Sequence, residues 1–342
     1  MIIAKPLAVA LCAILATAPL LADAQAPQSK PPAPAVPATQ GADAPAPAKG
    51  ADHPANDATT TTGDDAMLRA QVLLDRAHFS PGEIDGRGGS NTGRAIAAFQ
   101  RSRDLAPSGE LDEATWKALN ADAAPVLVEH AIATADVGGP FRKLPDDMME
   151  QSKLEALGYE SAAEALGEKF HASPALLERL NPGKDLASAG TRIVAPNVAG
   201  AAPLAEVAKV VVDKSDSAVR LLAADDKVLA HFPASTGSEH DPLPIGEWSI
   251  KGVARDPSFH YNPDLFWDAD KSHAKATLAP GPNNPVGVAW VDLSKEHYGI
   301  HGTPVPANVG KTASHGCIRL SNWNVQVLAA AVKPGTPAVL QE

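Results

Sequence analysis

Apolar residues recur at helical spacing along the stretch 66–122. A run at 67–77 is followed by turn-forming residues, and a second helix is expected after them with Ile96 and Phe99 on one face. A third helix is expected to begin after Asp112, whose carboxylate can accept hydrogen bonds from the first turn. The pattern predicts a small all-α module of three helices, near the lower size limit for an unaided hydrophobic core.

Residues 123–200 are interpreted as a linker that contains a short folded segment at about 158–198. The letters SPALLERLNPG predict a helix that stops at Asn-Pro-Gly, and another short helix is predicted before them. The letters GTRIVAPN then predict a short strand. The alternative is a spacer that only packs against the domain that follows.

Residues 206–342 instead show short runs with the composition of strands. Asp225 and Asp226 lie between two such runs, where a hairpin turn is expected. One helix is predicted after them, with Ser321 or Asn322 as its cap. Its buried stripe is expected at Val325, Leu328, Ala329 and Val332. This part of the chain is therefore predicted to be a mainly β domain with a mixed sheet.

Composition determines how the first 65 residues are interpreted. Residues 1–24 combine one early cation, Lys5, with an apolar run and an Ala-Asp-Ala sequence, a pattern typical of a secretory signal peptide. A membrane anchor is the alternative, but the run is short for a span and contains Pro19. Residues 25–65 are rich in Ala and Pro and predict a disordered linker. We therefore expect an exported protein with no membrane span after signal cleavage.

The formal net charge of the chain is -11 at pH 7. The sequence has no stripe of Lys and Arg that could neutralise phosphate groups. This balance argues against nucleic acids and anionic lipids as partners.

Export also determines whether the two cysteines could form a disulfide with each other. Cys12 is expected to leave with the signal peptide, so Cys317 would have no partner for a disulfide within the chain. A nucleophilic thiol needs a base, and it needs amide donors for the oxyanion of its intermediate. The amides of Gly316 and of Cys317 itself are suitable donors. Of two nearby histidines, geometry favours His301, at the end of a predicted strand, over His315 as the base.

Two other interpretations of this thiol are weaker. An inert buried cysteine is the commonest fate of a free thiol. A zinc site made by His301, His315 and Cys317 lacks a carboxylate base at a recognisable spacing, so we do not expect zinc there. Upstream, the aromatic letters FHYNPDLFWD at 259–268 indicate core packing more than a substrate wall.

The residues around the thiol resemble the motif of the YkuD-type L,D-transpeptidase family. They are His301, Gly302, a variable loop, the letters SHGC at 314–317, and Arg319. The resemblance extends over the chain from residue 208 onward. It implies that Cys317 is the nucleophile and that His301 is the base, oriented by the carbonyl of Gly302.

The same resemblance implies roles for the other residues of the motif. Arg319 would face an anionic group of a peptide stem. Ser314, His315 and Gly316 would shape the pocket and the oxyanion site.

The family reaction cleaves the bond between a diamino acid and D-Ala in a tetrapeptide stem of peptidoglycan, and it implies no metal and no cofactor. D-Ala leaves, and an amine of a second stem or of a wall-anchored lipoprotein resolves the thioester. Water as the acceptor would make the protein an L,D-carboxypeptidase, and a non-catalytic wall-binding protein is a further alternative. This reaction would place the protein in the periplasm, associated with the cell wall.

The upstream segments resemble modules of bacterial wall enzymes. Residues 66–122, with the letters PGEIDG, AIAAFQ and SGELDEATWKAL, resemble a peptidoglycan-binding module. Residues 158–198 look like a LysM-like glycan-binding element. The expected fold class is thus multidomain: an all-α module, a LysM-like α/β segment and a mainly β L,D-transpeptidase domain.

Overall fold

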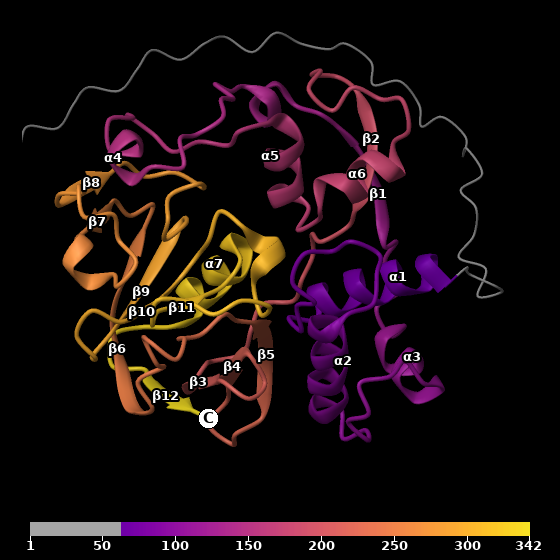
Figure 1. Cartoon of the computed structure of the whole chain (residues 1–342). Helices are drawn as coiled ribbons and strands as arrows, with labels where there is room; N and C mark the ends of the chain where they lie inside the picture. The colour runs from indigo at the N-terminus through magenta and orange to yellow at the C-terminus, as the bar shows by residue number, and fades with distance from the viewer. Residues whose placement is uncertain (1–62) are drawn as a thin grey trace, which may run out of the picture. The chain divides into compact units, whose positions relative to one another are not determined.

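The computed structural model describes residues 63–342, which are drawn in colour in Figure 1. The predicted signal peptide at 1–24, and the predicted linker up to residue 62, lie outside the described residues. Within 63–342 no helix is long and apolar enough to cross a membrane.

Three helices form the first part of the described chain, as the spacing predicts. They are α1 (Gly63–Arg76), α2 (Ser90–Ser102) and α3 (Glu113–Leu119). Phe79 and Phe99 meet edge to face in the core, with ring centroids 5.5 Å apart. The Asp112 carboxylate caps α3 by accepting from the Thr115 amide. The first helix begins at Gly63, within the stretch predicted to be linker.

The middle part contains a two-stranded antiparallel sheet and several short helices. The elements are β1 (Leu127–Ala131), a 3-10 helix (Thr134–Val137), α4 (Met148–Gln151), α5 (Ala162–Lys169), α6 (Pro174–Leu180) and β2 (Arg192–Pro196). The two predicted helices and the strand after them are present as α5, α6 and β2. Strand β1, which pairs with β2, was not predicted, because its partner lies far along the chain and its side chains are mostly exposed.

Within residues 63–342, the largest sheet has eight strands in the order β11-β10-β9-β6-β12-β3-β4-β5. The strands are β3 (Lys209–Asp213), β4 (Ala218–Leu222), β5 (Val228–Pro233), β6 (Gly246–Arg255), β9 (Ala289–Leu293), β10 (Gly299–His301), β11 (Ile318–Arg319) and β12 (Pro337–Gln341). β12 runs parallel to β3 and β10 runs parallel to β11, while the other pairs are antiparallel. The predicted mixed sheet is therefore confirmed.

Helix α7 (Asn322–Ala331) packs beside β9 and β10, where Figure 1 shows it in yellow. Ser321 is its N-cap, and Val325, Leu328 and Ala329 are buried as predicted. Val332 follows the last turn and is only half-buried. A hairpin of β7 (Phe259–Tyr261) and β8 (Ala276–Leu278) extends from the sheet, with a 3-10 helix (Pro263–Leu265) between its strands.

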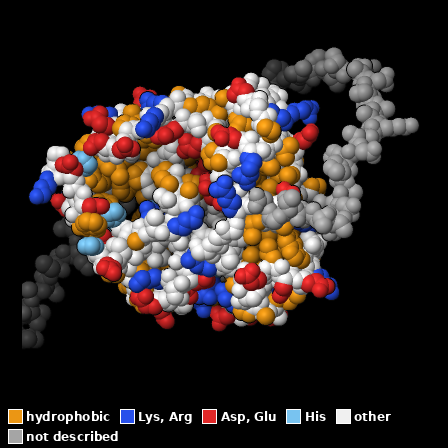
Figure 2. All heavy atoms as spheres, turned by 45° about the vertical axis from the view of Figure 1, so that its right-hand side comes forward, with side chains coloured by type: hydrophobic (Ala, Val, Ile, Leu, Met, Phe, Trp, Pro, Cys, Tyr) orange, Lys and Arg blue, Asp and Glu red, His pale blue; other side chains and the backbone are white. Residues whose placement is uncertain are grey.

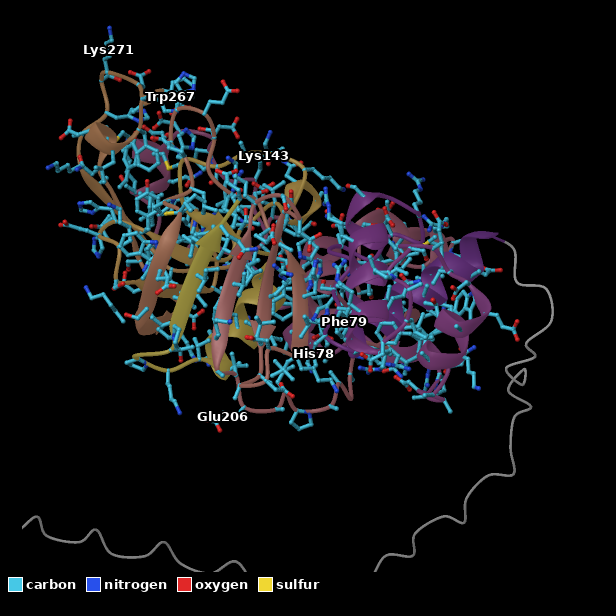
Figure 3. The ribbon with its side chains drawn as sticks, turned by 90° about the horizontal axis from the view of Figure 1, so that it is seen from below. His78, Phe79, Lys143, Glu206, Trp267 and Lys271 are labelled. Atoms are coloured by element: carbon cyan, nitrogen blue, oxygen red, sulfur yellow. The ribbon has the colours of Figure 1, made fainter. Side chains whose placement is uncertain are left out.

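The edge strand β5 is covered by the helical module. The Ser80 amide donates to the His231 carbonyl and the His231 amide donates to the His78 carbonyl, both at 2.9 Å. Figure 3 shows His78 and Phe79 where the helices meet the strands. Pairing of this kind removes the exposed hydrogen-bonding edge of a sheet and fixes the module against it.

Candidate active site

Cys317 lies immediately before β11 and is the free cysteine of the described residues. It is half-buried, and its thiol lies 3.7 Å from the carbonyl oxygen of His297. Burial raises the pKa of the Cys317 thiol, and the Gly299 amide partly opposes this rise. The preceding Gly316 has φ +94°, and a side chain there would press against the ring of Tyr298.

His301 is the last residue of β10, and its side chain is buried. In the parallel pair, Ile300 lies opposite Ile318 and His301 lies opposite Arg319. The thiol of Cys317 is next to the start of β10 and the imidazole of His301 is at its end. The strand pair therefore brings together two residues that are separated by a whole loop in the sequence.

The tautomer of His301 is fixed by its neighbours. Its Nδ1 lies 2.7 Å from the Gly302 carbonyl oxygen, and a carbonyl can only accept, so Nδ1 carries the proton and Nε2 is the basic nitrogen. The ring stacks on Trp290, with 5.4 Å between centroids. Burial, and then the positive charge of Arg319, lowers the pKa of His301 to about 4. Both shifts favour a neutral thiol beside a neutral imidazole at pH 7.

Arg319 extends toward the loop before Cys317. Its guanidinium donates to the Thr312 hydroxyl at 3.2 Å and to the Ala313 carbonyl, while its buried Nε has no partner. Among residues 63–342 no carboxylate lies within ion-pair distance of this guanidinium. Burial lowers its pKa. A half-buried cation without a counter-charge is suited to bind an anionic group of a ligand.

Ser314 and His315 occupy different positions around the thiol. The Ser314 hydroxyl donates to the Cys317 carbonyl at 2.5 Å, and its amide donates to the Thr236 carbonyl at 2.9 Å. Ser314 therefore closes the turn that carries the thiol. His315 instead points to the hairpin, where its Nε2 lies 3.0 Å from both carboxylate oxygens of Asp268.

The aromatic stretch 259–268 is only partly core. Tyr261 is buried as predicted, but Trp267 is 62% exposed and stacks on His240, with centroids 4.5 Å apart. Phe266 and Trp267 both lie beside His315. The preference for core packing was therefore wrong for Trp267, because the hairpin carries it to the surface near the motif. In Figure 2 histidines lie at the edge of a hollow lined by hydrophobic side chains.

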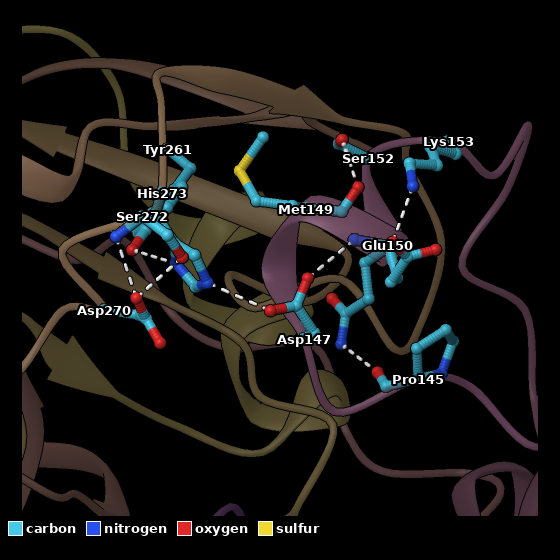
Figure 4. Close-up of polar contacts among 11 residues, drawn as sticks. Pro145, Asp147, Met149, Glu150, Ser152, Lys153, Tyr261, Asp270, Ser272 and His273 are labelled. Atoms are coloured by element: carbon cyan, nitrogen blue, oxygen red, sulfur yellow. Dashed lines mark hydrogen bonds and ion pairs between the residues drawn. The ribbon is translucent and has the colours of Figure 1, made fainter.

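The hairpin is held by a segment of the middle part. His273 Nδ1 lies 2.9 Å from the Tyr261 hydroxyl, and its Nε2 lies 2.9 Å from the Asp147 carboxylate at the start of α4 (Figure 4). Asp147 also caps α4 by accepting from the Glu150 amide. The side chains beside His315 are thus connected to residues more than a hundred positions upstream.

Asn322 also belongs to the site. The sequence predicted it only as a possible helix cap and gave it no part in the site. It is 2% exposed, and its Oδ1 accepts from the Val288 amide at 3.2 Å. A Cβ added to Gly302 or to Gly287 would overlap this oxygen. Asn322 therefore packs directly behind the residue whose carbonyl holds the imidazole. In the sequence, the only sign of this role was that Asn322 lies five residues after the thiol.

Residues 63–342 contain no group of three or more His, Cys, Asp and Glu side chains that could hold a metal ion. His301 is bound to Gly302, and His315 is bound to Asp268. The site therefore consists of a thiol, an imidazole with one basic nitrogen and a guanidinium without a carboxylate partner. These are the components of a cysteine-dependent acyl-transfer enzyme.

Comparison with known proteins agrees with this class. Residues 208–340 match the L,D-transpeptidase catalytic domain, and residues 63–119 match a peptidoglycan binding domain. The chain is 31% identical over 175 residues to the L,D-transpeptidase YkuD of Bacillus licheniformis, covering 51% of this chain and 89% of that protein. It is 30% identical to the L,D-transpeptidase YqjB of Bacillus subtilis, over 42% of this chain and 76% of that one. The chain belongs to the L,D-transpeptidase family.

Solved structures of the same family are more distant. One is LdtMt1 in complex with imipenem, at 23% identity and a TM-score of 0.31, covering 39% of this chain and 57% of that one. Another is an L,D-transpeptidase from Xylanimonas cellulosilytica, at 15% identity and a TM-score of 0.35, covering 80% and 92%.

Glu168 of α5 connects the middle part of the chain to the site. Its Oε1 lies 3.3 Å from the Asn322 Nδ2, which also donates to the Pro282 carbonyl at 3.1 Å. Burial raises the pKa of Glu168 to about 8, and the charges of Glu164 and Glu83 act in the same direction. Glu168 is therefore protonated at neutral pH.

This shift predicts a dependence of stability on pH. Between about pH 5 and 8 the folded protein keeps a proton on Glu168 that the unfolded chain releases, so the free energy of unfolding falls by roughly 1.4 kcal/mol per pH unit from this group. Glu168→Gln cannot ionise and should remove that slope. Denaturant unfolding of both proteins should give equal stability near pH 4.5 and a growing advantage of the variant toward pH 8.

Glu178→Gln, an exposed change on the neighbouring helix, is the matched control and should differ from the parent by a constant small amount. A difference between Glu168→Gln and the parent that does not change with pH would contradict the assignment.

Proposed function

We propose that this chain is a peptidoglycan L,D-transpeptidase in which Cys317 is the nucleophile and His301 is the base. The observation that carries the proposal is the hydrogen bond from His301 Nδ1 to the Gly302 carbonyl. It leaves Nε2 as the basic nitrogen on the strand pair that also positions the thiol.

The reaction follows from these groups. Nε2 takes the thiol proton while Sγ attacks the carbonyl carbon between a diamino acid and D-Ala. The oxyanion is stabilised by the amides of Gly316 and Cys317. The imidazolium then protonates the leaving amine, D-Ala departs and a thioester remains on Cys317. Arg319 binds a carboxylate of the stem, for which its unpaired Nε is suited.

The second half of the reaction needs an acceptor. An amine of another stem, or of a wall-anchored lipoprotein, attacks the thioester, gives its proton to His301 Nε2 and displaces the Cys317 thiolate. The thiolate then takes this proton back from Nε2, which restores the neutral thiol and the neutral imidazole. Water in place of the amine would release a tripeptide, which is the carboxypeptidase alternative. A purely wall-binding protein would not need the thiol and the imidazole, and both are present. Action on peptidoglycan places the protein outside the cytoplasm, in the periplasm.

A β-lactam of the carbapenem class should acylate Cys317. Intact-mass spectrometry is expected to show one adduct on the parent protein and none on Cys317→Ala, because no other thiol remains in the described chain. With a tetrapeptide stem, cross-linked dimer would indicate a transferase and tripeptide a carboxypeptidase. A carbapenem adduct on another residue, or none on the parent, would overturn the assignment of the nucleophile.

The depressed pKa of His301 predicts the pH profile of acylation. The second-order rate constant reports the free enzyme, so it should stay nearly level from pH 8 to pH 5 and fall only as His301 is protonated near pH 4. Stopped-flow measurement with a carbapenem would test this. His260→Gln, an exposed histidine, serves as the control. A fall centred near pH 6.5, the value of an unperturbed imidazole, would contradict the depressed pKa of His301.

The upstream parts are proposed to bind the wall. The residues that match a peptidoglycan binding domain would hold the enzyme on its polymer. A LysM-like role for the middle part is supported by its arrangement, in which β1 and β2 pair and the helices α5 and α6 lie between them in sequence. A hollow of about 450 Å³ lies between the start of α5 and the loop after α6.

Filling that hollow should weaken glycan binding. Ala187 is exposed and lines it, so Ala187→Trp is expected to reduce the affinity for a soluble N-acetylglucosamine oligomer by about tenfold or more, as expected when a ligand loses its contact surface. Calorimetric titration of the full chain would measure it. Ala121→Trp, at an exposed alanine elsewhere, should bind like the parent. Equal affinity of Ala187→Trp and Ala121→Trp for the N-acetylglucosamine oligomer would contradict the LysM-like assignment.

A further inference from the structure

A cavity of about 480 Å³ lies where the three parts of the described chain meet. The helical module contributes Glu83, and the middle part contributes the segment around α4 together with α5. The catalytic domain contributes Asn283, the segment from Pro304 to Pro306, which follows shortly after His301 and Gly302, and Trp323 of α7. The cavity is therefore adjacent to the catalytic loop but separate from the thiol.

The lining of this cavity is strongly acidic. Five carboxyl side chains line it, and among the described residues no Lys, Arg or His does so: Glu83, Asp146, Glu160, Glu164 and Glu168. Burial raises the pKa of both Glu83 and Glu168, because ionising a carboxyl group in this partly buried space is costly, and the charge of Lys311 only partly opposes the rise at Glu83. A cation inside the cavity would offset this cost.

The spacing of the carboxyl groups indicates what kind of cation fits. Residues 63–342 hold no cluster of three or more acidic, His or Cys groups close enough together to bind a metal ion. The acidic groups are spread around a space large enough for several heavy atoms. An organic cation, such as an ammonium on a flexible chain, fits this arrangement better than a divalent ion, which needs converging oxygens.

Two further atoms indicate that the ligand carries more than a charge. Trp323 is 6% exposed, its ring stacks on His171 at 5.1 Å, and its Nε1 is buried with no hydrogen-bond partner. Gln151 also lines the cavity, and its buried Oε1 has no donor. Buried polar atoms are nearly always paired, and this unpaired donor and this unpaired acceptor belong to two side chains that line the same cavity.

We propose that this cavity binds a peptide with a free primary amine, whose ammonium lies among the carboxyl groups and whose carbonyl or carboxylate accepts from Trp323 Nε1. An amine-bearing peptide stem has this chemistry. The identification of the stem as the ligand rests on the proposed peptidoglycan substrate, while the class of the ligand follows from the cavity itself.

Calorimetric titration of the full chain carrying Cys317→Ala tests the proposal without turnover. The probes are the tripeptide N-acetyl-L-Ala-D-Glu-L-Lys, whose one amine is that of the lysine side chain, the same peptide acetylated on that amine as well, and cadaverine, a diamine without a carbonyl or carboxylate acceptor. The tripeptide with a free amine should bind, and acetylation should weaken it about tenfold or more, because a charge-assisted hydrogen bond is lost.

Two variants test the ammonium of the ligand and its hydrogen-bond acceptor separately. The double variant Glu83→Gln and Glu164→Gln should weaken both the tripeptide and cadaverine about tenfold, since both carry the ammonium. Trp323→Phe keeps the ring on His171 but removes Nε1, so it should weaken the tripeptide and leave cadaverine unchanged. Glu155→Gln, at an exposed acidic residue outside the cavity lining, is the matched control and should bind like the parent.

Binding at the active site is distinguished with the parent protein acylated by a carbapenem, where the thiol is blocked. The tripeptide should still bind there, and the effects of the cavity variants should persist. Equal binding of the acetylated tripeptide, no effect of the double variant, or loss of binding on acylation would overturn the cavity assignment. A parent protein that a carbapenem does not acylate would instead count against the proposed function and leave the Cys317→Ala titrations valid.

Discussion

The active site depends on the parallel pairing of β10 with β11, a strand of only two residues. Such a short pairing is marginal by itself, and it is completed from the other side by Ser235. The Ser235 amide donates to the Arg319 carbonyl at 3.0 Å, and the Arg319 amide donates to the Ser235 carbonyl at 2.9 Å. The loop between the strands is fixed by Asn91 of the helical module, whose Nδ2 donates to the Val309 carbonyl at 2.9 Å. The thiol is thus positioned by three separate stretches of the chain.

The buried environment of His301 has a second consequence. A neutral imidazole beside a neutral thiol stores no ion pair in the resting site, so proton transfer must accompany attack on the substrate. The geometry of the imidazole then matters more than its charge. That geometry is set by the Gly302 carbonyl, which lies against Asn322, and Asn322 is in turn bound to Glu168 of another part of the chain. The middle part therefore contributes to the surroundings of the base as well as to any contact with glycan.

Local patterns were sufficient to predict much of this protein. Helical spacing predicts α2 and α3, and short runs of strand-forming residues predict the mixed sheet. The motif around the thiol indicates Cys317 and His301 as candidate site residues. Pairing between distant segments could not be predicted, because periodicity carries no information about partners. β1 was missed for this reason, and so was the contact between Glu168 and Asn322. The exposure of Trp267 depends on where the hairpin lies, which composition does not determine. The roles of the individual site residues stay predictions.

The acidic cavity is a feature that stability alone does not explain. Glu160 and Glu164 accept from backbone amides and Glu168 lies against Asn322, but no basic side chain lines the cavity. Acidic groups gathered in a partly buried space lower stability, and replacing them with neutral residues is usually an easy gain. They come from two parts of the chain, and the wall of the cavity is completed by a third that carries the catalytic loop. None of these parts could form the cavity alone. Such a gathering of acidic groups conflicts with the general rules of folding. Because it lies where the modules meet and beside the site, it is more readily explained by ligand binding than by packing. On this argument the upstream modules do more than hold the enzyme on its polymer: they complete a binding site next to the residues that react.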